Sequence, residues 1–196
     1  YDSVRQAIEL GWEHIKLYFM AGLPGETYED LAGIGEIARK IMDINFGVRG
    51  RKGGRFRVTV SVSNFVPKAH TPFQWAAQNR PEEFIDKHNF LSGKLKIKGV
   101  TFNYHETGTS NLEAVFARGD RRVADLLERA VELGCKFDGW TEHFDPELWK
   151  QAFEDTGTNM DFYIYRERSY DEILPWDIID PLLDRDFLIK ENEKAK

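Results

Sequence analysis

The sequence contains a single cysteine and no long apolar run, and each shortage excludes a class of protein. Cys135 is alone among 196 residues, so the chain has no second thiol for an internal disulfide and too few ligands for a cysteine-rich zinc or iron–sulfur site. No apolar stretch approaches the roughly 20 residues that a membrane helix needs, and no secretory signal is visible. We therefore expect a cytoplasmic protein with no membrane contact.

Positive charge is not in excess either. The formal net charge is −6, so the chain as a whole has no general attraction to nucleic acid or to an anionic membrane. A hydrophobic content of 41% and a charged content of 31% are typical of a folded globular protein. The chain begins at Tyr1 rather than at Met and enters a helical pattern almost directly, so we interpret it as a fragment of a longer protein.

The stretch from His14 to Asp30 organises the rest of the chain. Bulky apolar side chains on both faces of its first residues indicate a strand of a parallel sheet. Gly22-Leu23-Pro24-Gly25 ends this strand, because glycine reaches backbone angles that other residues avoid and proline cannot continue a ladder. Thr27 and Asp30 have the spacing of a capping box at the start of an amphipathic helix. Because α/β proteins place ligands at the carboxyl ends of parallel strands, the turn is a candidate ligand site, although a turn without a ligand fits the motif equally well.

Helices and strands alternate through the first 105 residues. We expect a helix over residues 3–10 with Ser3 as its N-cap, and a helix after Thr27 that ends near Ile44. Residues 56–63 alternate strictly between apolar and polar side chains, which fits a barrel strand with a polar lumen and fits an antiparallel strand with one wet face equally well. This order indicates part of a parallel α/β unit with too few elements to close an eight-fold barrel. Two further elements are expected: a helix from Pro81 that buries Phe84, Ile85, Leu91 and Leu95, and a strand over residues 99–105.

Two connecting segments carry residue types that bind ligands. Residues 47–55 are glycine-rich and basic, a composition that fits a solvated loop better than a phosphate contact. Residues 64–75 are expected to form an ordered loop, in which His70 fits a surface position better than a substrate contact. His105 and Glu106 are metal-binding types without a recognisable ligand spacing, so we predict no metal site here.

Beyond residue 105 the pattern becomes helical. We expect helices over residues 110–117 with Ser110 as N-cap, over residues 120–133, and from Asp145 to just before Gly157. His143 and Asp145 again lack a metal-ligand spacing. Three tryptophans are expected to anchor the core of this part rather than to stack bases: Trp140, Trp149 and Trp176.

Two motifs taken together resemble the radical S-adenosylmethionine superfamily. FMAGLPGETYEDL resembles the fifth barrel strand and turn of those enzymes, and SVSNFVPKAHTPFQW resembles the sixth strand and exit loop of their cobalamin-domain members. LEAVFARGDRRVADLLERA and GCKFDGWTEHFD resemble the C-terminal part of one largely uncharacterised family among them. The resemblance implies a (β/α)6 partial barrel with a [4Fe–4S] cluster and S-adenosylmethionine, whose reductive cleavage yields a 5′-deoxyadenosyl radical that abstracts hydrogen from a substrate. Residues 1–105 would be the C-terminal half of this α/β barrel, and residues 106–196 a helix-rich, family-specific extension.

The resemblance also implies which residues meet the cofactor. Met20 would pack on the adenine and Gly22 would let the backbone approach it, although core packing remains open for Met20. The other implied cofactor-binding positions are Leu23 and Glu26 in the first motif, and Asn64 and Val66 in the second; a purely structural turn remains open for the second pair. The superfamily's CxxxCxxC loop is missing, and Cys135 alone cannot replace its three thiolates, so this chain by itself should be inactive.

The implied partners follow from what is missing. The N-terminal half of the barrel would complete the enzyme, and the unknown substrate could be a small molecule or an RNA that meets the basic residues Arg49, Arg51, Lys52 and Arg55. The free edge of the strand over residues 14–20 predicts pairing between copies into a homodimer. The competing hypothesis is a non-catalytic interaction or scaffold module whose aromatic tail docks a partner.

Overall fold

The computed structural model describes residues 1–50, 55–140 and 142–195, which form two compact units. The first unit consists of Tyr1–Phe65 and Pro81–His105, and the second consists of Val66–Arg80 and Glu106–Lys196. The expected division after residue 105 differs from this arrangement at residues 66–80. These residues belong to the second unit because their side chains and backbone are bound there: Val66 lies in its core, and the Gln78 amide donates to the Ile164 carbonyl at 2.9 Å.

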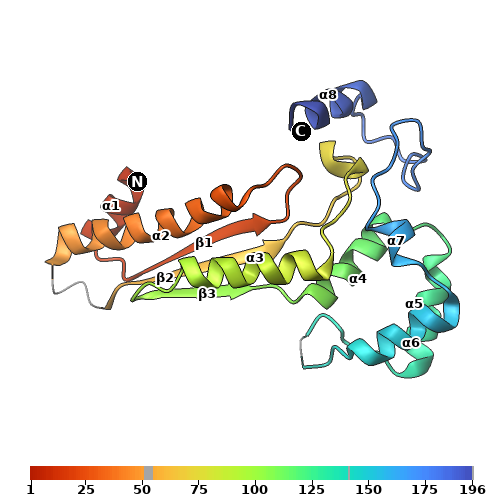
Figure 1. The fold of residues 1–196 in the computed structure, drawn as a ribbon, viewed down its shortest axis with the longest axis horizontal. Coiled ribbons are helices and arrows are strands. Elements are labelled where there is room, and N and C mark those ends of the chain that lie inside the picture. Colours follow the sequence, from red (N-terminus) through yellow and green to blue (C-terminus); the bar gives the residue numbers. More distant parts are fainter. Residues whose placement is uncertain (51–54, 141, 196) are drawn as a thin grey trace. The chain divides into compact units, whose positions relative to one another are not determined.

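The first unit alternates helices with parallel strands (Figure 1). Its elements are α1 (Asp2–Glu9), β1 (His14–Ala21), α2 (Tyr28–Arg49), β2 (Arg57–Asn64), α3 (Pro81–Lys94) and β3 (Val100–Tyr104). The strands form one sheet in the order β1-β2-β3, and both neighbouring pairs run parallel. The α/β class with a parallel sheet is thereby confirmed, and the antiparallel interpretation of residues 56–63 is wrong.

One face of this sheet and the helices bury a common core. Val58, Val60 and Val62 of β2 are fully buried, whereas the serines between and after them are only half-buried on the opposite face. The strand therefore alternates between a helix-covered side and a side outside this core. The apolar residues that join the valines come mainly from α2 and α3: Leu31, Ile34, Ala38, Ile41 and Leu91.

Helix boundaries follow local caps in some places and tertiary contacts in others. The Thr27–Asp30 capping box is confirmed, because each residue's side chain accepts a hydrogen bond from the other's backbone. α2 continues past the expected end at Ile44 to Arg49, whose guanidinium donates from Nε to the Ile8 carbonyl at 3.1 Å. Ser3 is not a cap, since α1 begins after Tyr1 without a side-chain bond.

The second unit is helical, apart from its connecting segments. Its elements are the 3-10 helix η2 (Pro72–Trp75) and the helices α4 (Thr107–Arg118), α5 (Val123–Leu133), α6 (Pro146–Thr156), α7 (Met160–Tyr163) and α8 (Arg185–Ala195). The predicted ends at Gly134 and Gly157 are confirmed, and both glycines have the left-handed conformation that stops a helix. Asp145 caps α6 by accepting from the Glu147 and Leu148 amides.

Three expectations about single side chains are wrong. Ser110 lies inside α4, where its hydroxyl donates to the Glu106 carbonyl at 3.1 Å instead of capping the helix. Ile85 on α3 is exposed rather than buried. Trp140 is also exposed, whereas Trp149 and Trp176 are buried in the two apolar clusters of the second unit. In the described part of the chain, no helix has both the length and the apolar character of a membrane span.

Candidate functional site

The carboxyl ends of β1 and β2 lie side by side, because the two strands are parallel and in register. Met20 pairs with Ser63, and Ala21 pairs with Asn64. The ladder continues one step further, where the Phe65 amide donates to the Ala21 carbonyl at 2.8 Å. Both exits therefore meet at one edge of the sheet, which is the edge where α/β proteins bind ligands.

Glu26 holds the turn that follows β1. Its Oε2 accepts a hydrogen bond from the Gly22 amide at 2.9 Å. The same oxygen forms an ion pair with Lys87 Nζ at 2.6 Å. The side chains of Glu26 and Lys87 are only 6% and 13% exposed. Gly22 and Gly25 both have positive φ, at 96° and 78°, which favours glycine at these two points. The predicted cofactor residues Gly22 and Glu26 thus bind each other, and Glu26 fixes the shape of the turn.

The face of the sheet that points away from the core of the first unit carries polar and amphipathic side chains. Tyr18 and Met20 on β1 are 72% and 51% exposed, while Leu17 and Phe19 pack against the core. Parallel sheets normally bury both faces, so such large exposed side chains are unusual. Core packing of Met20 is therefore wrong for this chain. The register aligns these residues with hydroxyl and amide side chains in two rows, Tyr18–Ser61–Asn103 and Met20–Ser63.

A cavity of about 410 Å³ lies between the end of β1, the turn and α2. Three of the predicted cofactor residues line it, namely Met20, Leu23 and Glu26. Apolar side chains of α2, including Ile34 and Ile37, form its other wall. The cavity thus combines a mostly apolar wall with two carboxylates, those of Glu26 and Asp30, and small-molecule sites share this composition.

The two predicted residues of the second motif lie apart in the fold. Asn64 is buried at the end of β2, and its Nδ2 donates to the His105 carbonyl at 3.4 Å, which links the exits of β2 and β3. Val66 is buried in the core of the second unit, so its side chain does not belong to the site at the strand ends. Met20, Gly22, Leu23, Glu26 and Asn64 are therefore brought together by the sheet, and Val66 is not.

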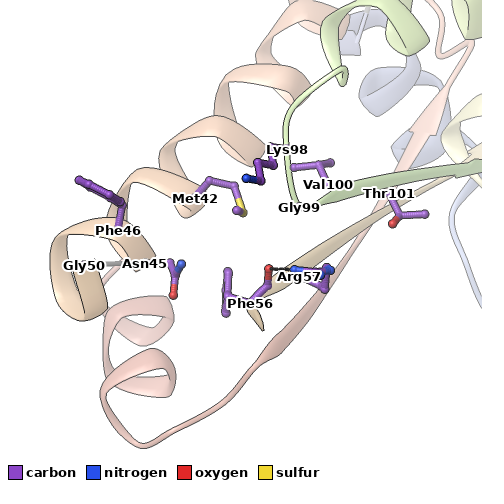
Figure 2. Close-up of a pocket in the computed structure, with 10 residues that line it drawn as sticks. All are labelled: Met42, Asn45, Phe46, Gly50, Phe56, Arg57, Lys98, Gly99, Val100 and Thr101. Atoms are coloured by element: carbon purple, nitrogen blue, oxygen red, sulfur yellow. Dashed lines mark hydrogen bonds between the residues drawn. The ribbon is translucent and has the colours of Figure 1, made fainter. Parts of the chain in front are cut away.

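A second cavity of about 560 Å³ lies at the opposite ends of the strands. Figure 2 shows the Met42 side chain of α2 extending toward the Gly99 turn at the start of β3, with Asn45 of the same helix nearer Phe56. Arg57 closes one side, where its Nη1 donates to the Phe56 carbonyl at 3.0 Å. Because amino ends of parallel strands are not where this class of fold binds ligands, we favour the carboxyl end as the functional site.

The expected basic edge lies partly in the fold and partly outside the described residues. Arg49 donates from Nη2 to the Trp12 carbonyl at 2.9 Å, in addition to its bond with Ile8, so it closes the end of α2. Arg51 and Lys52 lie outside the described residues. His70 is half-buried at a positive φ of 55°, and its amide donates to Gln74 Oε1 at 3.1 Å.

Within the described ranges, no group of three or more His, Cys, Asp or Glu side chains lies close enough to hold a metal ion. Cys135 is buried in the second unit, and burial together with the Asp138 and Asp145 carboxylates raises the pKa of its thiol. A raised pKa keeps the thiol protonated at neutral pH, which disfavours both metal ligation and nucleophilic attack.

Two residues near the strand ends were missed by the sequence analysis. Lys87 closes the turn through Glu26 from a position 61 residues away, and nothing in its local sequence marks that role. His88, the next residue of α3, is buried and stacks on Tyr104 with ring centroids 4.3 Å apart. Burial lowers the pKa of His88, so its ring is neutral at physiological pH. Its signal in the sequence was the helical spacing of four residues from Phe84, which places it on the buried stripe.

The fold and site define an α/β protein with a three-stranded parallel sheet and a separate helical unit. No protein-family profile matches the chain, and no solved structure matches it. It is similar to an uncharacterized protein of Methanocaldococcus jannaschii, MJ0966, with 29% identity over 131 residues, which are 65% of this chain and 26% of that protein. The matched part is thus about a quarter of the length of this relative.

Proposed function

We propose that the first unit is the C-terminal portion of a (β/α)6 partial barrel in a radical S-adenosylmethionine enzyme. In this proposal the carboxyl ends of β1 and β2 bind the adenosyl part of the cofactor. The observation that carries the proposal is the exposed face of a parallel sheet, on which Tyr18 and Met20 adjoin a row of hydroxyl groups. In a barrel this face is the lumen, and it is polar where a ligand is held.

The chemistry of this face suits a nucleoside. The flat ring of Tyr18 and the polarizable thioether of Met20 can pack against a purine, while Ser61 and the neighbouring Asn103 can hydrogen-bond ribose hydroxyls. Glu26 and Lys87 would act as positioning residues, because they hold the turn that ends the strand. When bound in the complete enzyme, S-adenosylmethionine supplies the radical that takes a hydrogen atom from the substrate.

The residues present do not fit the iron–sulfur cluster. Its attachment needs three thiolates, and the chain has one cysteine, which is buried in the other unit. We therefore derive no step through the cluster from this chain, and we assign its ligands to the proposed N-terminal half of the barrel. In this proposal the complete protein, rather than this chain alone, binds the substrate, which is an RNA or a small molecule.

The first test uses the chain alone. After anaerobic reconstitution with iron and sulfide, we expect no [4Fe–4S] absorption bands and no 5′-deoxyadenosine from added S-adenosylmethionine. Cluster bands near full occupancy would refute the assignment of the cluster to another part of the protein.

The second test addresses the exposed sheet face in the longer parent protein. Met20→Asp places a charge where the adenine would pack, and we expect calorimetric titration to show S-adenosylmethionine binding at least about tenfold weaker. Thr101→Asp is the matched control, because Thr101 is exposed on the same face of the sheet as Met20 but lies near the amino end of its strand, β3. Equal affinities for both variants and the unaltered protein would contradict the proposed site.

A non-catalytic interaction module is the alternative, and one observation favours it. Six large apolar side chains near the end of the second unit are between 48% and 91% exposed: Ile173, Ile178, Ile179, Leu182, Leu183 and Phe187. Large exposed apolar side chains often mark protein interaction sites where they form a contiguous patch. Anaerobic purification of the longer parent separates the two functions, since a cluster-free parent that does not bind S-adenosylmethionine would support the module.

A further inference from the structure

Two arginines are buried next to each other in the second unit. Arg118, the last residue of α4, is 0% exposed, and Arg168, which follows α7, is 5% exposed. A guanidinium group is among the most expensive groups to bury, and it is normally tolerated only with an anionic partner or a full set of acceptors.

Backbone carbonyls hold part of each guanidinium. Arg118 Nε donates to the Tyr163 carbonyl at 3.0 Å, and Arg168 Nη2 donates to the same oxygen at 3.2 Å. Arg168 Nη2 also donates to the Arg118 carbonyl at 3.0 Å. Because both side chains share one acceptor, the two positive groups are immediate neighbours.

The remaining nitrogens have no acceptor among the described residues. These are Nη1 and Nη2 of Arg118, and Nε and Nη1 of Arg168, all of them buried. In the described part of the chain, neither arginine forms an ion pair. The carboxylate with an electrostatic effect on both is Glu172, but Arg166 already holds it through two hydrogen bonds of 2.7 and 2.6 Å.

The surrounding charges make the pair more electropositive. Burial, followed by Arg168 and Arg166, lowers the pKa of Arg118 to about 9, so its guanidinium is still charged at neutral pH. Burial, followed by Arg166, also lowers the pKa of Arg168. Arg168 also lies over the ring of Trp176, with its central carbon 5.1 Å from the ring centroid. This contact fixes the plane of the guanidinium but supplies no negative charge.

We propose that Arg118 and Arg168 form a binding site for an oxyanion, the carboxylate or phosphate group of a ligand. The two terminal nitrogens of Arg118 present the planar fork that matches two oxygen atoms of such a group. Arg168 adds two further buried donors without an acceptor, its Nε and Nη1. This site lies wholly within the second unit, and it does not depend on the function proposed for the first.

A weak signal for this site is present in the sequence. Arg118 is four, three and seven residues after Ala114, Val115 and Asn111, which are all buried on α4. An arginine at the end of a buried helical stripe is out of place unless something compensates its charge. Arg168 has no comparable signal, because it lies in an irregular segment.

The competing explanation is that the two arginines only hold backbone carbonyls of the second unit together and bind no anion. Titration with anions distinguishes this structural role from an oxyanion site. The whole 196-residue chain is titrated by calorimetry with inorganic phosphate and, separately, with malonate at fixed ionic strength. Binding of phosphate alone assigns a phosphate-bearing ligand, and binding of malonate alone assigns a carboxylate-bearing one. Binding of both supports the oxyanion site without a preference, and binding of neither would overturn it.

The variant Arg118→Lys keeps the charge and one donor for the Tyr163 carbonyl but loses the fork. We expect the affinity for the bound anion to fall at least about tenfold while the far-ultraviolet circular dichroism stays unchanged. Arg80→Lys is the matched control, because Arg80 is exposed in the same unit and paired with Asp161. If Arg118→Lys does not fold, Arg168→Lys takes its place. Undiminished affinity in the folded variant, or an equal loss in the Arg80 control, would refute the site.

Discussion

Glu26 shows how one side chain can set the shape of a site without being its reactive group. It binds the amide of Gly22 and the ammonium of Lys87, and both charged side chains are nearly buried. Removing one member of such a pair leaves the other charge without compensation. We expect Glu26→Gln to lower the free energy of unfolding of the first unit by about 2–4 kcal/mol. The unfolding transition of this unit in urea measures the change.

The control for this prediction is an exposed ion pair in the second unit. Lys68 and Glu113 interact through side chains that are about half exposed to water. Glu113→Gln should therefore change stability by less than about 1 kcal/mol. In the double variant Glu26→Gln with Lys87→Met, part of the loss should be recovered, because no buried charge remains unpaired. A loss from Glu26→Gln no larger than the control's would show that the buried pair does not hold the turn.

The capping box of α2 predicts a pH effect at a single carboxyl group. Hydrogen bonds from the Thr27 side chain and backbone lower the pKa of Asp30 below its ordinary value of 3.8. Its contribution is therefore fully present above pH 3.8 and is lost as the pH falls through the lower folded-state value. In Thr27→Ala we expect the pKa of Asp30 to rise toward 3.8, measured by nuclear magnetic resonance titration. An unchanged pKa would mean that the cap is not what lowers it.

The residues of the site differ in how far sequence alone could define them. Gly22 and the Thr27–Asp30 cap were readable, because a positive φ and a three-residue spacing are local requirements. Met20 was undecided between core and lumen, since apolar side chains occur in both. Lys87 was missed because its contact with Glu26 spans 61 residues, and long-range ion pairs leave no local pattern.

At the scale of the element, β2 offers a direct comparison of its two faces. Val60 is fully buried under the helices, and Ser61, the next residue, is half-buried on the opposite face. We expect Val60→Ala to destabilise the first unit by about 2–3 kcal/mol through the lost packing. Ser61→Ala should stay within about 0.5 kcal/mol of the unaltered chain, because it removes no core contact. Thermal unfolding of the two variants side by side measures the difference, and equal effects would mean that the faces are not distinct.

The ends of helices were predictable where a local residue sets them and unpredictable where a distant contact does. The ends at Gly134 and Gly157 were predictable because glycine alone suffices for the left-handed stop. The end of α2 was not, because Arg49 stabilises the extra turn through carbonyls at Ile8 and Trp12. Ser110 had the right residue type for a cap, but α4 begins one turn earlier.

At the scale of the whole molecule, β1 is an edge strand of the sheet. The Glu13 and Ala21 carbonyls accept hydrogen bonds from Arg57 and Phe65, on the β2 side. Because the backbone groups of successive residues in a strand point to opposite sides, the even-numbered residue Tyr18 points its amide and carbonyl toward the free edge. We expect the chain to form dimers through this edge at high concentration. Tyr18→Pro should weaken the dimer about tenfold without breaking the ladder to β2, as measured by light scattering. A monomer at every concentration would contradict the prediction.

The sequence by itself determined the alternation of helix and strand, the glycine turn after β1 and the caps of α2 and α6. These features depend on residues a few positions apart, whose backbone preferences and hydrogen bonds act locally. Only the tertiary structure decided that residues 66–80 join the helical unit, that Tyr18 and Met20 lie outside the core, and that Arg118 meets Arg168. Each of these depends on packing between segments distant in the chain, which the one-dimensional pattern does not encode.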